Sequence, residues 1–222
     1  MYKEIIKAFE DSIDGEVFES LEFSFAVKQL KNSKAHLKFL IGKPGSGKSF
    51  LINHVFKDAV ILKASLTKEE LDAHLTKDKL IVIDEAQLLY TMLLEEIRIL
   101  ADSKQYTFLL SMHLEDAKEI LEKEHFKSRD IDIIELKLLT KEEMIRYIDV
   151  KFLKHNITHI LTKRQFDKVY KYTNGNFRYI KKFMKVLFEL LQFAETHHIS
   201  RHYDINDCLI TMTAIKLGLE NE

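Results

Sequence analysis

The chain has 222 residues, 46% of them hydrophobic and 31% charged, with a formal net charge of −1, which is enough for one good core with a smaller appendage. Its single cysteine, Cys208, excludes an internal disulfide, and no apolar run reaches the roughly 18 residues of a membrane span or resembles a leader peptide. We therefore expect a cytoplasmic protein, and because the scattered histidines show no HxxH or CxxC spacing, we expect no metal site formed by them.

A glycine-rich loop follows the first predicted strand. The apolar stretch HLKFLI, residues 36–41, is typical of a buried strand, and FLINHVFKD, residues 50–58, is typical of a helix. Between them, GKPGSGKS satisfies the pattern G-x-x-x-x-G-K-[ST], with Gly42, Gly47, Lys48 and Ser49 at the specified positions. The strand, loop and helix context is the one this phosphate-binding motif requires, so the sequence predicts a nucleotide site.

Each residue type in this loop has a chemical reason. Glycines let backbone amides turn towards a phosphate, and the amino end of the following helix adds partial positive charge. Lys48 would bridge the β- and γ-phosphates, and the Ser49 hydroxyl would bind Mg²⁺. We therefore predict ATP and Mg²⁺ as ligands. The predicted contact residues are Gly42, Lys43, Pro44, Gly45, Ser46, Gly47, Lys48, Ser49 and Phe50.

A second motif, KLIVIDEAQ, occupies residues 79–87. Its apolar run predicts a central parallel strand, and acids at the carboxyl end of such a strand lie where open α/β sheets bind ligands. Asp84 would hold Mg²⁺ through water. Glu85, one position further, would orient and polarise the attacking water, which predicts hydrolysis of ATP.

The remaining patterns predict a two-part chain. Apolar runs at residues 58–65, 106–112 and 131–136 add three strands, giving five strands that alternate with helices in a three-layer α/β domain over residues 1–139. Residues 140–222 show only helical patterns and predict a small domain of four helices. Thr140 with Glu143 forms a capping-box pattern, and Thr162 and Asp204 are further candidate caps.

The stretch IDEAQLLYTMLLEEIRIL, residues 83–100, resembles the AAA+ ATPases, in particular the branch with the ExeA/GspA, TnsC/TniB and Orc/Cdc6-like proteins. Residues 129–155 are also similar to the passage from the last strand into the lid domain of that family, and the resemblance covers about residues 20 to 215. It implies a P-loop NTPase fold with a five-stranded parallel sheet of order 5-1-4-3-2, a helical lid and nucleotide-dependent homo-oligomers.

The same resemblance implies roles for four further residues. The motif GNFR places Arg178 as the lid arginine that reaches the γ-phosphate, and Arg129 in HFKSRD as an arginine finger for the nucleotide of a neighbouring subunit. The family has GQPEL after its fourth strand, where this chain has SMHLED. The polar sensor of that strand is therefore either Ser111 or His113.

These patterns predict an oligomeric ATPase of ExeA-like type that remodels or assembles an unidentified protein client. The alternative is an ATP-dependent DNA-binding switch, because residues 140–222 carry 14 Lys and Arg against 10 Asp and Glu, whereas residues 1–139 carry 20 against 25. No winged-helix pattern supports that alternative, so DNA is not the favoured partner. A DEAQ-type helicase would need two RecA-like domains, and the chain has one. ExeA-type relatives continue into a membrane span and a periplasmic domain that this sequence does not contain.

Overall fold

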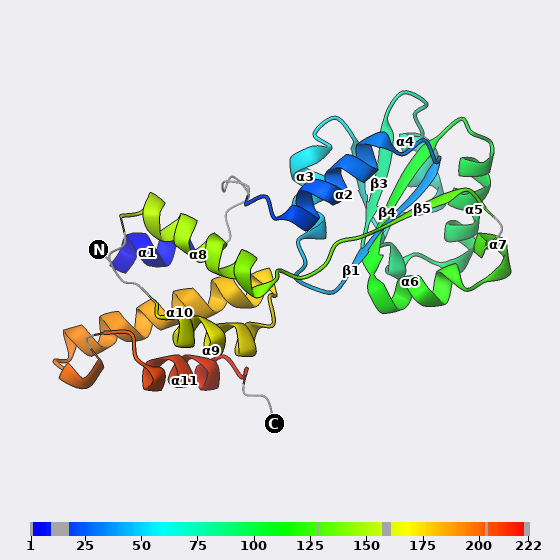
Figure 1. Ribbon diagram of the computed structural model, residues 1–222. Helices are drawn as coiled ribbons and strands as arrows, with labels where there is room; N and C mark the ends of the chain where they lie inside the picture. The colour runs from blue at the N-terminus through cyan, green and yellow to red at the C-terminus, as the bar shows by residue number, and fades with distance from the viewer. Residues whose placement is uncertain (1, 10–17, 128, 157–160, 203, 220–222) are drawn as a thin grey trace. The chain divides into compact units, whose positions relative to one another are not determined.

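The computed structural model describes residues 2–9, 18–127, 129–156, 161–202 and 204–219. The chain divides into two compact units, an α/β unit of Glu19–Lys137 and a helical unit of Met1–Phe18 with Leu138–Glu222 (Figure 1). The second boundary lies within two residues of the one expected after residue 139. The start of the chain groups with the helical unit, because helix α1 (Tyr2–Ala8) contacts helix α10 (Phe177–Thr196).

The α/β unit is built on a five-stranded parallel sheet of order β2-β3-β4-β1-β5, which confirms the predicted fold class and strand order. All six residues of β1 are buried, and the strand lies between β4 and β5. Such burial explains why its sequence is apolar apart from Lys38, whose Nζ donates to the Ser33 carbonyl at 3.1 Å. The strands are β1 (Leu37–Gly42), β2 (Val60–Lys63), β3 (Leu80–Asp84), β4 (Thr107–His113) and β5 (Ile131–Glu135).

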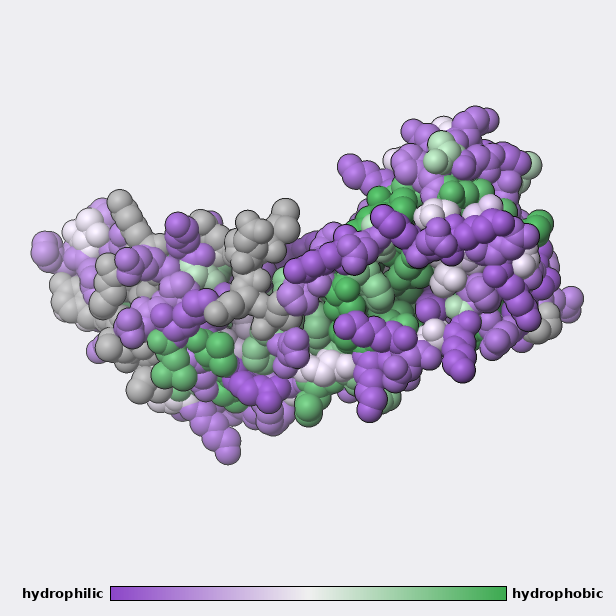
Figure 2. Space-filling model, turned by 90° about the horizontal axis from the view of Figure 1, so that it is seen from above, coloured by the Kyte–Doolittle hydropathy of each residue, from purple (hydrophilic) through white to green (hydrophobic). Residues whose placement is uncertain are grey.

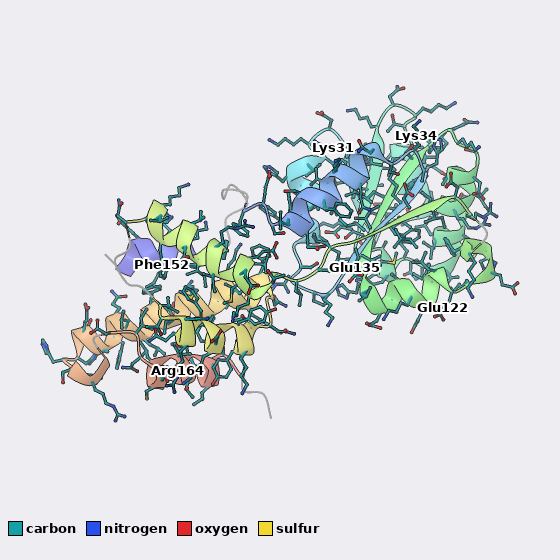
Figure 3. The ribbon with its side chains drawn as sticks, in the orientation of Figure 1. Lys31, Lys34, Glu122, Glu135, Phe152 and Arg164 are labelled. Atoms are coloured by element: carbon teal, nitrogen blue, oxygen red, sulfur yellow. The ribbon has the colours of Figure 1, made fainter. Side chains whose placement is uncertain are left out.

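Helices cover both faces of the sheet. One face packs its alternate side chains, among them Phe39, Ile83 and Leu110, into a core with helices α4 to α7. Helices α2 and α3 belong to the opposite layer, and Figure 3 labels Lys31 in α2 and Glu122 after α6 on the two sides of the sheet. The helices are α2 (Leu21–Asn32), α3 (Lys48–Val55), α4 (Lys68–His74), the short η1 (Ala86–Leu88), α5 (Thr91–Asp102), α6 (Leu114–Leu121) and α7 (Glu124–Lys127).

The helical unit buries one continuous apolar core. Phe9, directly after α1, meets Tyr147 and Phe152 edge to face, so the start of the chain contributes aromatic contacts to a core formed mainly by α8, α9 and α10. The predicted helices in residues 140–222 are confirmed as α8 (Lys141–Lys154), α9 (Lys163–Thr173), α10 and α11 (Asp207–Lys216), with a short turn of helix, η2 (Ser200–His202), before the last.

Side-chain caps set where these helices begin. Thr140 and Thr162 both form complete capping boxes, as their sequence patterns predicted. The expected cap at Asp204 is wrong, because α11 begins three residues later and its cap is Asn206, whose side chain accepts a hydrogen bond from the Leu209 N–H. Aspartate and asparagine are both good caps, so composition alone did not separate the two positions.

The face seen in Figure 2 is mostly hydrophilic, with several groups of hydrophobic side chains among the charged ones. Among the described helices, none is long and apolar enough to cross a membrane.

Candidate nucleotide site

The loop between β1 and α3 has the backbone that its glycines predicted. Gly45 has φ 77° and Gly47 has φ 100°, in the region where a side chain is strained. Gly42 has a different constraint, since a Cβ built there would lie 2.4 Å from the Leu136 carbonyl oxygen and 2.8 Å from Ser46 Oγ. The chain therefore turns tightly from the sheet into the helix, with no room for a side chain at Gly42.

Lys48 points back into this loop. Its Nζ donates to the Gly42 carbonyl at 2.7 Å and to the Lys43 carbonyl at 3.3 Å, and the residue is 9% exposed. Burial lowers the pKa of Lys48 below the ordinary 10.5, while the nearby carboxylates of Asp84 and Glu85 act in the opposite direction. The structure thus brings the lysine of the first motif together with both acids of the second.

The other loop residues differ in exposure. Ser46 is buried, its N–H donates to the Lys43 carbonyl at 3.2 Å, and its hydroxyl has no hydrogen-bond partner among the described residues. Ser49 lies exposed in the first turn of α3, and Phe50 packs against Phe23 and stacks on His54. Lys43 and Pro44 are exposed at the tip of the loop.

The acidic pair lies where β3 ends. Asp84 is the last residue of the strand, and Glu85 adopts a left-handed conformation with φ 56° and ψ 38°. The Glu85 N–H donates to Asp84 Oδ1 at 3.0 Å, and the Glu85 side chain is exposed. A positive φ is uncommon for a residue with a side chain, and here it turns the chain directly after the strand.

Both candidates for the polar sensor lie on β4, between β3 and β1. Ser111 pairs with Leu40 of β1, is fully buried, and has a hydroxyl without a partner among the described residues. His113 pairs with Gly42 and is partly exposed, with Nδ1 3.7 Å from Asp116 Oδ2. Side chains two apart on a strand share a face, so Ser111 and His113 stay alternatives.

Two predicted arginines lie in different surroundings. Arg178 is exposed in the first turn of α10, where Asn176 accepts hydrogen bonds from the Arg178 and Tyr179 N–H groups and Gly175 has φ 70°. It belongs to the helical unit. Arg129 lies in the α/β unit just before β5, where its guanidinium pairs with Asp102.

Several polar contacts around these residues were not predicted. The Gln87 side-chain oxygen is buried and without a partner among the described residues, although nothing in the letters DEAQ distinguishes it. Asp102 follows Arg98 by four residues, which does indicate a helical ion pair, and Nη1 of Arg98 is 3.0 Å from Asp102 Oδ2. Its second partner, Arg129, is 27 positions away, and no local pattern predicts that contact.

No protein-family model matches the sequence, and no curated protein is similar to it. Solved structures do match the fold. The Thermotoga maritima RuvB Holliday junction branch migration motor is 18% identical with a TM-score of 0.57, over 86% of this chain and 66% of RuvB. A Walker-type ATPase of Pyrococcus abyssi gives 15% identity and a TM-score of 0.60, over 87% and 79%. Pyrobaculum aerophilum Cdc6p gives 13% and 0.58, over 85% and 66%.

These similarities, together with the strand order and the loop before α3, define an AAA+-like P-loop fold. The chain spans about two thirds of the length of the RuvB and Cdc6p structures. At such low identity the comparisons concern the fold alone. The proteins similar to this chain include a motor, a Walker-type ATPase and Cdc6p, so the fold does not favour the ExeA branch over the others.

Proposed function

We propose that the protein binds ATP with Mg²⁺ and hydrolyses it to ADP and phosphate. The observation that carries this proposal is the buried Lys48 ammonium, which lies in a loop with two positive-φ glycines and close to Asp84 and Glu85. A cation and converging backbone amides suit the phosphates of a nucleotide. The Ser46 hydroxyl, buried and without a partner among the described residues, adds an unused polar group beside them.

The roles of the residues follow from their positions. Lys48 would bind phosphate oxygens, and Glu85 would accept the proton of the attacking water, which needs a carboxylate open to solvent. Ser49 and Asp84 would hold Mg²⁺, whose positive charge would neutralise the phosphates. Ser111 or His113 would contact the same phosphates from β4, and Arg178 would bind the γ-phosphate from the helical unit. These roles agree with the ones that the family resemblance implied.

We further propose that the protein acts as an oligomer in which Arg129 serves the nucleotide of a neighbouring copy. Ile131 pairs with Leu37 at the start of β1, whereas the phosphate loop begins at Gly42 at its end. At about 3.3 Å per residue, the two ends of the strand are roughly 17 Å apart. An arginine side chain does not span that distance, which supports a role of Arg129 on a partner's nucleotide rather than on its own loop.

The ExeA-like role in remodelling or assembling a protein client is the finer part of the proposal. It rests on the resemblance of residues 83–100 to that branch. The alternative, a DNA-binding switch, is supported by the spacing of four basic residues on α10 and is tested separately below.

Two substitutions test hydrolysis. Lys48→Ala should abolish ATP binding, while Glu85→Gln should bind ATP normally and hydrolyse it at least about 10²-fold more slowly, because only the second removes the base. Equilibrium binding of a fluorescent ATP analogue and phosphate release measure the two effects. Lys43→Ala is the matched control, since this lysine is in the same loop but exposed. Normal ATP binding by Lys48→Ala would exclude the proposal.

A further inference from the structure

Arg129 is attached to its own subunit by two contacts. One guanidinium nitrogen, Nη1, pairs with Asp102 Oδ2 at the carboxyl end of α5, and Nε donates to the His125 carbonyl at 3.0 Å. The Arg129 and Asp102 side chains are 35% and 36% exposed. The guanidinium is therefore reachable from solvent, but two of its three nitrogens are engaged.

Asp102 also forms an ion pair with Arg98 of its own helix. The same Oδ2 accepts from Arg98 Nη1 at 3.0 Å, and Arg98, whose side chain is 13% exposed, also donates from Nε to Glu95 Oε2 at 2.8 Å. The other oxygen of Glu95 lies 3.6 Å from His125 Nε2. Both α5 and α7 are thus joined to the segment that carries Arg129, and the two helices are labelled near one another in Figure 1.

We propose that Asp102 is a positioning residue that keeps Arg129 bound to its own subunit until the nucleotide of a neighbouring subunit binds the guanidinium. This inference rests on the proposed role of Arg129 in trans. A guanidinium that pairs with phosphate oxygens uses the same N–H groups that Asp102 and the His125 carbonyl occupy. Arg129 must therefore leave Asp102 before it can bind a phosphate, and the carboxylate competes with the partner's nucleotide.

The strength of this contact suits reversible release. Ion pairs between partly exposed side chains contribute little to stability, so a nucleotide with several charges can displace the carboxylate. Arg98 still pairs with Asp102 after Arg129 has left, so the Asp102 carboxylate keeps an ion-pair partner. α5 also begins six residues after Glu85 and is about 18 Å long. The helix therefore runs from the segment after Glu85 to Asp102, the residue that pairs with Arg129.

The test measures ATP hydrolysis per subunit as a function of protein concentration. Removing the carboxylate in Asp102→Asn or Asp102→Ala should lower the concentration for half-maximal activity about two- to fivefold, the factor that an exposed ion pair corresponds to. The plateau should stay at the wild-type level because Arg129 is unchanged. Asp102→Glu should restore most of the wild-type curve. Glu115→Gln, which removes an exposed pair with Lys118 on α6, is the matched control and should change nothing.

A double variant separates this mechanism from a general effect on folding. Asp102→Asn combined with Arg129→Ala should behave like Arg129→Ala alone, with a flat concentration dependence, because Asp102 acts only through Arg129. A half-maximal concentration that is unchanged or raised in Asp102→Asn would overturn the inference. So would a shift that persists in the double variant. If Arg129→Ala alone keeps the wild-type dependence, the proposed role in trans fails instead, whatever Asp102 does.

Discussion

Glu85 combines a proposed catalytic role with an unfavourable backbone conformation. Its left-handed φ of 56° costs a residue with a Cβ about 1–2 kcal/mol, a cost that glycine does not bear. Because the side chain is exposed, few contacts are lost on truncation. Glu85→Gly should therefore be about 1 kcal/mol more stable than Glu85→Ala, although both should lose hydrolysis. Urea unfolding curves measure the difference, and equal midpoints for the two variants would show that the turn is not strained.

Because of Lys48, we predict that the protein takes up a proton when it binds ATP at alkaline pH. Burial lowers its pKa in the free protein below 10.5, so part of the population is neutral in the alkaline range just below that value. Phosphate oxygens beside the ammonium would raise the pKa, and the protein would take up a proton as it binds. Near neutral pH the lysine is charged in both states and no uptake is expected. Calorimetry in two buffers of different ionisation enthalpy measures this, with Lys43→Met, at an exposed position of the same loop, as the control that should leave the uptake unchanged.

Gly175 determines how α9 turns into α10. Its φ is 70°, its carbonyl accepts from the Leu139 N–H, and a Cβ there would lie 2.0 Å from the Leu139 carbonyl oxygen. Gly218 has a similar φ of 64°, but a Cβ there would meet nothing within 4 Å. Gly175→Ala should thus destabilise the protein by about 2 kcal/mol more than Gly218→Ala, since only the first adds a clash to the strained φ. Thermal unfolding compares them, and equal losses would mean that Leu139 moves away freely.

The sequence predicted elements better than contacts between them. Strands such as β3 were placed to within one residue, because a buried parallel strand is an uninterrupted apolar run bounded by polar residues. The loop between β1 and α3 was also placed correctly, since its glycines, lysine and serine are adjacent in the chain, and its role in phosphate binding stays a prediction. The Asp102 to Arg129 pair and the left-handed Glu85 were not predicted. Both depend on how the chain folds back on itself, and no periodic pattern encodes that.

The distribution of charge over the whole chain argues against strong DNA binding. Arg178, Lys181, Lys182 and Lys185 follow helical spacing on α10, so they share one side of the helix, with Lys171 nearby in sequence on α9. Residues 1–139, however, carry five more acids than bases. We expect no submicromolar binding of duplex DNA at about 150 mM salt, because screening weakens phosphate contacts steeply.

Fluorescence anisotropy with the ATP-bound Glu85→Gln variant tests this expectation. Tight, ATP-dependent binding that disappears when Lys171, Lys181, Lys182 and Lys185 are all replaced by Glu would favour the DNA-switch alternative. Replacing Lys28, Lys31 and Lys34 of the α/β unit by Glu is the control for a general loss of positive charge.

The contact of α1 with α10 has a consequence for how the protein is made. A ribosome adds about 5–20 residues per second, so roughly ten to thirty seconds pass between the synthesis of α1 and that of its partner α10. The whole sheet, residues 37–135, is synthesised in the meantime and can fold as a unit. The apolar residues of the nascent α1 therefore remain without their final partners until α10 has been synthesised.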